Sequence, residues 1–319
     1  MHCALMAHTE ADLQMIVDKF AEASRLFGLT ISLGKTEVLF QPAPASNSAT
    51  PPSITINGTL LKTVQDFKYL GSVISNDGSI DKEINARLCK ASQALGRLKS
   101  RVLTQHNIRQ STKLKVYRTV VLTSLLYGCE AWTLYRRHLK KLEGFHMRSL
   151  RSIMNIKWQD KITNLEVLDR AKSTSIEAMI LQSRLRWTGH IIRMEDHRLP
   201  KQLMYGELCA GKRKRGRPIR RFKDCIKSDI KISGIAPKDL EPCAKDRNQW
   251  RATIRRTKDC FEARRRAEIT DARERRRKTS SAIQDDSNLF QCPHCPRACK
   301  SRIGLLSHLR VHNRRGSTQ

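Results

Sequence analysis

The sequence has no apolar run approaching 18 residues, and no basic and apolar regions of a secretory signal follow Met1. These absences predict that the chain neither spans a membrane nor is secreted, and that it works in a reducing compartment. Seven of the ten cysteines stand singly, at Cys3, Cys89, Cys129, Cys209, Cys225, Cys243 and Cys260. Because only Cys292, Cys295 and Cys299 cluster, the cysteines do not indicate a disulfide framework.

Signatures of catalysis are also missing. The sequence contains no P-loop, no dinucleotide-binding glycine fingerprint and no Ser/His/Asp or Cys/His arrangement. One pair of adjacent aspartates, Asp285 and Asp286, lies in a polar segment without the apolar strands that would hold it as a metal site. We therefore predict no catalytic residues and no small-molecule substrate.

Acidic residues are scarce. The chain has 30 Asp/Glu against 61 Lys/Arg, which gives a net charge of +31 and a pI near 10.3. Residues 1–78 hold five Lys/Arg and seven Asp/Glu, a net charge of −2, so residues 79–319 carry +33. Such a surface repels itself unless it meets a polyanion, most commonly DNA or RNA. A ribosomal-type or merely basic soluble protein is the alternative.

The first 78 residues have a mixed helix and strand pattern. Apolar residues recur at helical spacing over residues 10–27, and Gly28 is suited to end that helix. The pattern further predicts strands at 29–32, 37–40 and 67–74, a loop at 41–53, and a hairpin at 54–61 that turns at Asn57-Gly58.

After Gly78 the pattern is helical, so the predicted fold class is α+β, mainly α. Three apolar stripes predict core faces: Ile84, Leu88, Ala91, Leu95 and Leu98; Leu114, Tyr117, Val121 and Leu125; and Leu139, Leu142, Phe145 and Leu150. The four tryptophans are predicted to anchor the packing: Trp132, Trp158, Trp187 and Trp250. Apolar residues thin out after Pro200, which predicts looser packing there.

Near the C-terminus, Cys292-x2-Cys295-x12-His308-x3-His312 has the spacing of a C2H2 zinc finger. Two thiolates on a tight turn and two imidazoles one helical turn apart converge on a tetrahedral Zn²⁺ ion. Leu305 occupies the position of the small apolar core, whereas Cys299 replaces the usual aromatic residue. His294 and Cys299 are spare donors that we expect not to bind the metal. The spacing predicts one structural zinc ion in a ββα finger.

The finger is poorly equipped to read bases. Its base-facing positions carry Ser301, Ile303, Gly304 and Ser307, none of which offers a bidentate contact to guanine or adenine. Its basic residues are better suited to phosphate, and they are Lys300, Arg302, Arg310, Arg314 and Arg315. Contact with RNA or protein stays open.

A dense basic tract precedes the finger. It holds Lys212, Arg213, Lys214, Arg215, Arg217, Arg220 and Arg221, which are the predicted nucleic-acid-binding residues. Three interpretations stay open: phosphate binding by a solvated loop, a nuclear-import signal, and insertion of Arg-Gly-Arg into a narrow minor groove. If the tract is an import signal, we expect the protein in the nucleus; if it is not, we expect it in the cytoplasm. Residues 251–278 form a second basic region, expected to be an exposed charged helix.

Several segments together resemble non-LTR (LINE-type) retrotransposon reverse transcriptases. They are CALMAHTE at 3–10, GLTISLGKTE at 28–37, FKYLG at 67–71, YGCEAW at 127–132, RLRWTGH at 184–190, Arg193-Met194 and RLP at 198–200. The order matches the family's palm, primer-grip hairpin, thumb and post-thumb region, over roughly residues 3–260. The resemblance implies a palm remnant (1–78) and a thumb-like helical region (79–200). Charge, polar composition and ligand spacing predict a basic nucleic-acid-binding segment (201–278), a linker (279–288) and the finger (289–314).

One departure from the family decides the expected activity. In the family, two metal-binding aspartates immediately precede the segment that begins here at Cys3, but this sequence has Met1 and His2 there. We therefore expect a zinc-binding and nucleic-acid-binding chain without polymerase activity. The alternatives are a fragment of an active RNA-directed DNA polymerase, and a host-used DNA-binding regulator that prefers AT-rich duplex.

Overall fold

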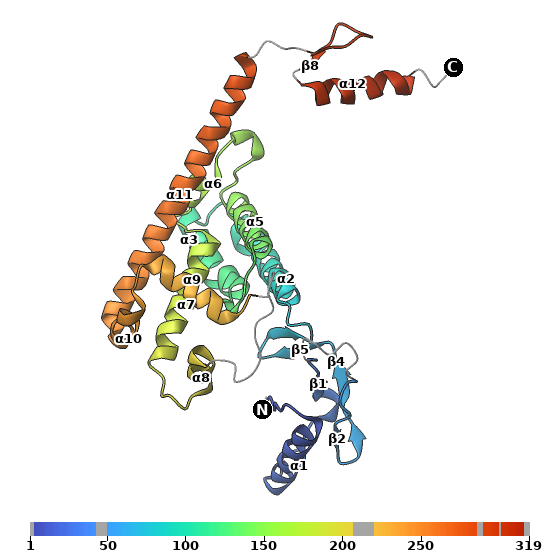
Figure 1. Ribbon diagram of the computed structural model, residues 1–319, viewed down its shortest axis with the longest axis vertical. Coiled ribbons are helices and arrows are strands. Elements are labelled where there is room, and N and C mark those ends of the chain that lie inside the picture. The colour runs from blue at the N-terminus through green and yellow to red at the C-terminus, as the bar shows by residue number, and fades with distance from the viewer. Residues whose placement is uncertain (1–2, 43–49, 207–219, 286–289, 300, 316–319) are drawn as a thin grey trace. The chain divides into compact units, whose positions relative to one another are not determined.

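The computed structural model describes residues 3–42, 50–206, 220–285, 290–299 and 301–315 (Figure 1). The chain divides into two compact units, Met1–Glu262 and Ala263–Gln319. It is mainly helical, and the strands in the described part form four two-stranded sheets. The α+β, mainly α fold class is confirmed at this level. None of the helices among the described residues has the length and apolar character needed to cross a bilayer.

The beginning of the first unit contains one helix and three small sheets. Its elements are α1 (Glu10–Leu26), η1 (Leu33–Lys35), β1 (Glu37–Leu39), β2 (Thr55–Ile56), β3 (Thr59–Leu60), β4 (Lys62–Val64), β5 (Asp66–Tyr69) and β6 (Ser72–Ser75). β1 pairs with β4 in parallel, whereas β2–β3 and β5–β6 are antiparallel hairpins. A small core joins α1 to the strands and consists of Val17, Val38, Ile54, Ile56 and Leu61.

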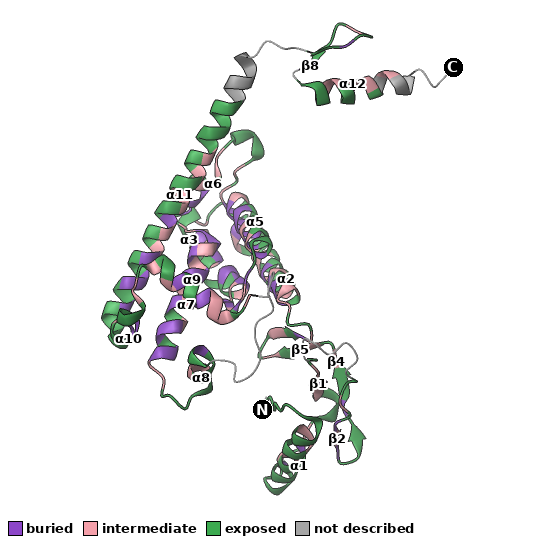
Figure 2. Ribbon diagram, in the orientation of Figure 1, coloured by how far each residue is buried: buried purple, intermediate pink, exposed green. Residues whose placement is uncertain are grey.

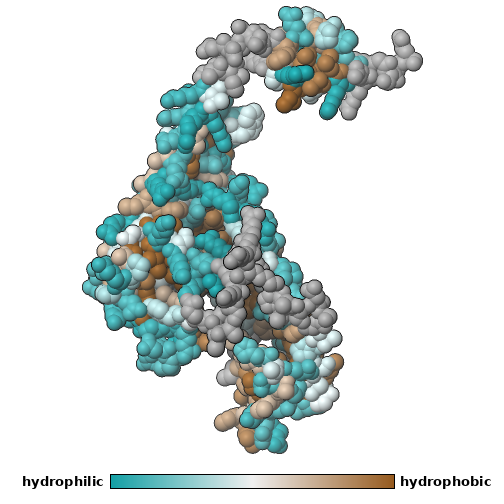
Figure 3. Space-filling model, viewed as in Figure 1, coloured by the Kyte–Doolittle hydropathy of each residue, from teal (hydrophilic) through white to brown (hydrophobic). Residues whose placement is uncertain are grey.

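The predicted first helix is confirmed, with caps at both ends. The Thr9 hydroxyl accepts a hydrogen bond from the Asp12 amide at 3.1 Å, and Gly28 follows the helix with φ +67°. Figure 2 shows that α1 is exposed along most of its length. Exposed apolar side chains include Leu26 and Phe27, and Figure 3 shows hydrophobic residues on the surface of this part.

The strand predictions succeeded in part. The hairpin that turns at Asn57-Gly58 is confirmed, and so is the strand that begins at Glu37. No strand forms at 29–32, where the chain instead enters a 3-10 turn. The single strand predicted for 67–74 is wrong: Leu70 and Gly71 both have positive φ, 48° and 85°, and turn the chain into the β5–β6 hairpin. Two successive positive φ values are typical of tight hairpin turns.

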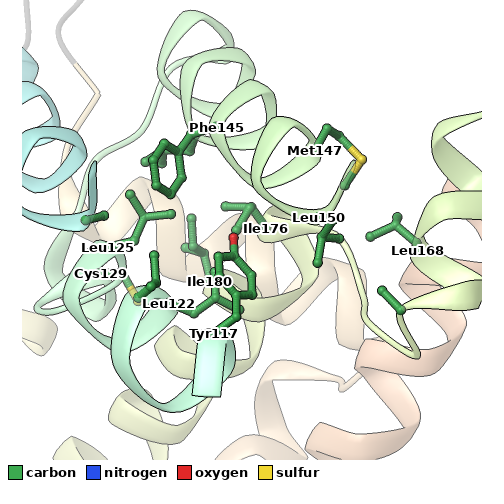
Figure 4. Close-up of a cluster of buried hydrophobic side chains, with 14 of the residues drawn as sticks. Tyr117, Leu122, Leu125, Cys129, Phe145, Met147, Leu150, Leu168, Ile176 and Ile180 are labelled. Carbon is green, nitrogen blue, oxygen red and sulfur yellow. The ribbon is translucent and has the colours of Figure 1, made fainter. Parts of the chain in front are cut away.

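The main core lies among the helices that follow. These are α2 (Asp81–Leu98), α3 (Gln110–Val116), α4 (Thr123–Leu125), α5 (Arg136–Ile153), α6 (Asn164–Arg170) and α7 (Ile176–Ile192). Shorter helical segments between them are η2 (Lys99–Leu103), η3 (Tyr117–Leu122), η4 (Cys129–Ala131) and η5 (Trp158–Asp160). Members of all three predicted apolar stripes pack in this core, which confirms them. Figure 4 shows Phe145 and Leu150 of α5 among Tyr117, Leu125 and Ile180 from other segments.

A second core continues past Pro200, so the predicted loosening there is wrong. It involves α8 (Leu199–Tyr205), α9 (Phe222–Ser233), α10 (Leu240–Lys245) and the first part of α11 (Arg247–Asp285). The short η6 (Pro237–Asp239) leads into α10. Few apolar residues suffice because each short helix contributes one or two to a shared cluster with α7. Trp132, Trp187 and Trp250 pack as expected, but Trp158 is 84% exposed. The segment expected to be a linker, 279–288, is helical as far as Asp285.

A buried histidine in the main core gives a first prediction. His146 is fully buried, with Nδ1 2.9 Å from the Tyr117 hydroxyl, and burial lowers its pKa from 6.5 to about 4. Below pH 6.5 His146 therefore becomes protonated in the unfolded chain but stays neutral in the folded chain. The free energy of unfolding falls between about pH 6.5 and pH 4 and levels off at lower pH. We expect a loss of about 2 kcal/mol between pH 7 and pH 5 from this residue.

Urea unfolding at both pH values measures the effect. His146→Gln should lose this part of the pH dependence, whereas the control His106→Gln, at an exposed position, should keep it. An unchanged pH dependence in His146→Gln would show that the imidazole takes up a proton equally well in the folded and unfolded chains, which would contradict the lowered pKa.

Candidate functional site

The four candidate zinc ligands lie in a hairpin turn and in the helix that follows it, within the second unit. β7 (Phe290–Gln291) pairs antiparallel with β8 (Ala298–Cys299), and α12 (Arg302–Arg315) follows. Cys292 and Cys295 lie in the turn between the strands, where the Cys292 amide donates to the Arg297 carbonyl at 3.0 Å. His308 and His312 lie on α12, four residues apart and therefore on the same face of the helix.

The donor atoms of these four residues lie within 4.8 Å of one another. His308 Nε2 is 3.2 Å from Cys295 Sγ and 3.1 Å from His312 Nε2. Ligand atoms at about 2.0–2.3 Å from a tetrahedral ion are separated by roughly 3.3–3.8 Å. The separations here are close to that range, so the group could hold a metal ion. Burial and the charges of His312 and Arg297 lower the pKa of His308, which favours the neutral imidazole that a metal requires.

The spare donors stand apart from this group. The four-residue group includes neither His294 nor Cys299. Cys299 is buried in β8, at the position of the missing aromatic residue, and the His294 ring lies 5.4 Å from the His312 ring between centroids. On α12, Ile303 is 79% exposed, so a base-facing position presents an apolar side chain. The expectation of weak base reading by the finger stays a prediction.

The basic tract lies almost entirely outside the described residues, which resume at Arg220. Lys212, Arg213, Lys214, Arg215 and Arg217 therefore have no structural description, and the same holds for Lys300 of the finger and for the side chains of Arg314 and Arg315.

The two described residues of the tract are tied to the fold. The Arg220 guanidinium donates to the Leu134 carbonyl at 3.1 Å. Arg221 precedes α9, where its amide donates to the Asp224 carboxylate at 2.9 Å. These contacts give Arg220 and Arg221 a structural role beside the predicted contact with nucleic acid.

The second basic region, 251–278, is helical as predicted, because it falls within α11. Hydrophilic side chains cover most of the face of α11 that Figure 3 presents. Oppositely charged residues pair along it, as in the Arg264–Glu268 contact at 3.0 Å. Acidic side chains on the same helix therefore neutralise part of its positive charge.

Two segments that carry the family resemblance lie against each other. The Tyr127 hydroxyl donates to the Leu70 carbonyl at 3.2 Å, at the tip of the β5–β6 hairpin. Arg87 of α2 lies 4.5 Å from the centre of the Tyr127 ring and donates to the Gly71 carbonyl at 2.7 Å. The buried Glu83 carboxylate pairs with Arg87 at 2.6 Å and accepts from the Val73 amide.

Sequence reasoning missed Glu83 and Arg87. In the sequence they are two opposite charges four residues apart, next to an apolar stripe. Such a pattern more often indicates an ion pair on the exposed face of a helix. Here the pair is buried and holds the hairpin on α2.

The RLRWTGH segment lies in α7 and contacts segments of the first unit that are distant in the sequence. Arg184 donates two hydrogen bonds to the Asp229 carboxylate of α9, at 2.6 and 2.7 Å. Trp250 of α11 donates its indole N–H to the Leu185 carbonyl at 3.1 Å and lies directly over Gly189. Asp229 and the fit of Gly189 to Trp250 were not predicted, because neither has a local sequence signal.

Gly189 gives a second prediction. A Cβ there would lie 2.0 Å from Trp250 Nε1, so Gly189→Ala must displace a buried indole. We expect a loss of about 1–3 kcal/mol in the free energy of unfolding. The control is Gly144→Ala in α5, where an added Cβ would meet no side chain and no other segment within 4 Å. Alanine should stabilise that helix by up to about 1 kcal/mol. Equal effects of the two substitutions on urea unfolding would contradict the close packing.

The chain is similar to proteins of mobile elements. It is 28% identical to a transposon-derived protein of Caenorhabditis elegans over 253 residues, which are 76% of this chain and 88% of that protein. It is also 24% identical over 156 residues to the RNA-directed DNA polymerase from mobile element jockey of Drosophila funebris, and 21% identical over 156 residues to that of Drosophila melanogaster. Each jockey match covers 48% of this chain and 17% of the polymerase.

No protein-family profile and no solved structure matches the chain. The similarities support the resemblance to reverse transcriptases of mobile elements. Because the chain spans only 17% of the length of each polymerase, they bear on neither the presence nor the absence of catalysis. They also leave the zinc finger as a prediction.

Proposed function

We propose that this chain is a retroelement-derived protein that binds nucleic acid through its positive charge and holds one structural Zn²⁺ ion in its C-terminal finger. The observation that carries the proposal is a net charge of +31 on a chain similar to RNA-directed DNA polymerases of mobile elements. Polymerases of this kind handle nucleic acid, and the excess charge provides the sequence-independent part of such binding. The proposed division remains 1–78, 79–200, 201–278, 279–288 and 289–314.

The proposed zinc site is structural and has no part in catalysis. Cys292, Cys295, His308 and His312 supply four protein ligands, which leave no open position for water or substrate. The ion would hold the strand turn to α12 in a segment too small to bury a sizeable apolar core of its own. The sequence offers no aspartate pair flanked by apolar strands, so we propose that this chain alone transfers no nucleotides.

A salt series tests where the proposed affinity resides. The triple variant Arg213→Gln, Arg215→Gln and Arg217→Gln is expected to bind DNA more weakly than a chelated wild-type sample does. It should also flatten the dependence of log K on log salt, by about 0.9 for each lost contact to duplex phosphate. If chelation costs more affinity than the triple substitution, the finger is the principal binding element and the tract serves another purpose.

The jockey similarity favours one alternative, a fragment of an active RNA-directed DNA polymerase. Primer extension by the purified full chain, on RNA and DNA templates with Mg²⁺, distinguishes the two. We expect no incorporation of nucleotides. Incorporation above that of a heat-inactivated sample would overturn the non-catalytic proposal. Genomic DNA that continues in frame upstream of the Met1 codon into a strand ending in two aspartates would favour the alternative.

A further inference from the structure

A cleft of about 720 Å³ lies between α7 and the beginning of α11, within the first unit. Its walls carry a row of basic residues from each helix, and its floor includes the buried Trp250 and Ile254. The basic residues are Arg186, His190 and Arg193 from α7, and Arg247, Arg251 and Arg255 from α11. The cleft therefore gathers five arginines around one space.

The charge in this cleft is not compensated within the described part of the chain. No carboxylate lines the cleft, and among the described residues none of its five arginines forms an ion pair with an acid. Burial and the positive charges of Arg247 and Arg251 lower the pKa of Arg193. Like charges held this close repel one another, so the free protein has a site that an anion would stabilise.

Two carboxylates close in sequence to the rows of arginines are engaged elsewhere. Asp246, just before α11, accepts hydrogen bonds from the amides of Asn248 and Gln249. Asp196, after α7, pairs with Lys201 at 2.8 Å. These acids contribute to helix ends and loops, and they leave the cleft cationic.

The spacing of the arginines suits a chain of anions. Arg247, Arg251 and Arg255 are four residues apart, so they follow one face of α11 at intervals of about 6 Å along its axis. Arg186 and Arg193 form a second row across the cleft. Two rows of this kind can contact several phosphates of one backbone, whereas a single phosphate would leave most of the charge unpaired.

The cleft is not built to read bases. Trp250 is only 2% exposed and its indole N–H is already bonded to Leu185, so it offers no face on which a base could stack. The described lining offers one exposed ring, the imidazole of His190, and no exposed Trp, Tyr or Phe. Two rows of arginines with so little aromatic surface are typical of contact with a phosphodiester backbone.

We propose that the α7–α11 cleft is a binding site for the phosphodiester backbone of nucleic acid, with Arg186, Arg251 and Arg255 as its main phosphate contacts. The inference deepens the proposed nucleic-acid binding and places part of it in the folded first unit, apart from the basic tract and the finger. Arg193 also donates to the Ala244 carbonyl at 2.6 Å, so it holds α10 as well as facing the cleft.

The test compares two triple variants of the full chain, each of which removes three positive charges. The cleft variant is Arg186→Gln, Arg251→Gln and Arg255→Gln. The control is Arg97→Gln, Arg101→Gln and Arg148→Gln, at exposed positions of α2, η2 and α5. All six positions are exposed, so both variants should unfold at the temperature of the wild type. Binding is measured on DNA duplex, RNA duplex and single strands across a salt series.

We expect the cleft variant to lose at least about tenfold in affinity for its preferred nucleic acid and the control less than about threefold. The salt slope on duplex DNA should fall by between about 2 and 3 in the cleft variant alone. The nucleic acid for which the cleft variant loses more affinity, DNA or RNA, is the one whose backbone the cleft binds.

Two other outcomes separate the proposals. If both triple variants lose affinity equally, the charge acts diffusely and the cleft is not a site, while nucleic-acid binding itself stands. If the wild-type chain binds none of the three probes, the proposed function fails, and the cleft inference fails with it.

Discussion

Replacing Cys295 with serine is expected to abolish stoichiometric zinc binding by the full chain. A neutral hydroxyl cannot replace a thiolate on Zn²⁺, and Cys295 Sγ lies in the group of four donors within 4.8 Å of one another. Binding of a structural zinc ion contributes on the order of 10–16 kcal/mol to the folding of such a segment, so the finger should unfold without it. Metal analysis of the purified protein measures the loss, and hydrogen exchange in residues 290–315 measures the unfolding.

The matched control for this substitution is Cys299→Ser. Cys299 is also a cysteine of the finger, but it lies outside the donor group and is buried in β8. We expect this variant to keep one zinc ion per chain. Zinc retained by Cys295→Ser and lost by Cys299→Ser would reassign the ligand. The main unfolding transition should be unchanged in both variants, because the helical cores belong to the first unit.

The features that the sequence predicted are those with a local signal. The apolar stripe of Ile84, Leu88 and Ala91 needs only helical periodicity, and it packs in the main core. The Asn57-Gly58 turn could be predicted because asparagine and glycine both tolerate positive φ, which both residues adopt here. The four candidate zinc ligands were proposed from their spacing alone, and the structure brings their donor atoms within 4.8 Å of one another.

The features that the sequence did not predict depend on distant partners. Nothing near Trp158 indicates that its side chain faces solvent, since tryptophan is usually packed. Alternating residues over 67–74 fit one strand as well as two, and the difference rests on positive φ at Leu70, which leucine seldom adopts. The α7–α11 cleft joins residues more than fifty positions apart in the sequence. Neither row of arginines therefore indicates that the other lies opposite it.

The Arg184–Asp229 pair is expected to give the largest effect of a single substitution on the first unit. It joins α7 to α9 through two hydrogen bonds, and the two side chains are 12% and 2% exposed. Burial raises the pKa of Asp229, and the bonds from Arg184 oppose that rise and favour the charged carboxylate. Asp229→Ala would leave the guanidinium buried without its partner, at a cost of about 3–5 kcal/mol in the free energy of unfolding.

A double variant distinguishes the cost of an unpaired buried charge from the stability that the ion pair itself contributes. Arg184→Met combined with Asp229→Leu replaces both charges with apolar side chains of similar size, and such replacements are often neutral. We therefore expect the double variant to recover most of the stability that Asp229→Ala loses in urea unfolding. Lys82→Ala is the control, since its pair with Asp66 has side chains 51% and 37% exposed and should contribute less than about 1 kcal/mol. A loss below about 1 kcal/mol in Asp229→Ala would mean that water reaches Arg184 and that the pair does not hold the two helices together.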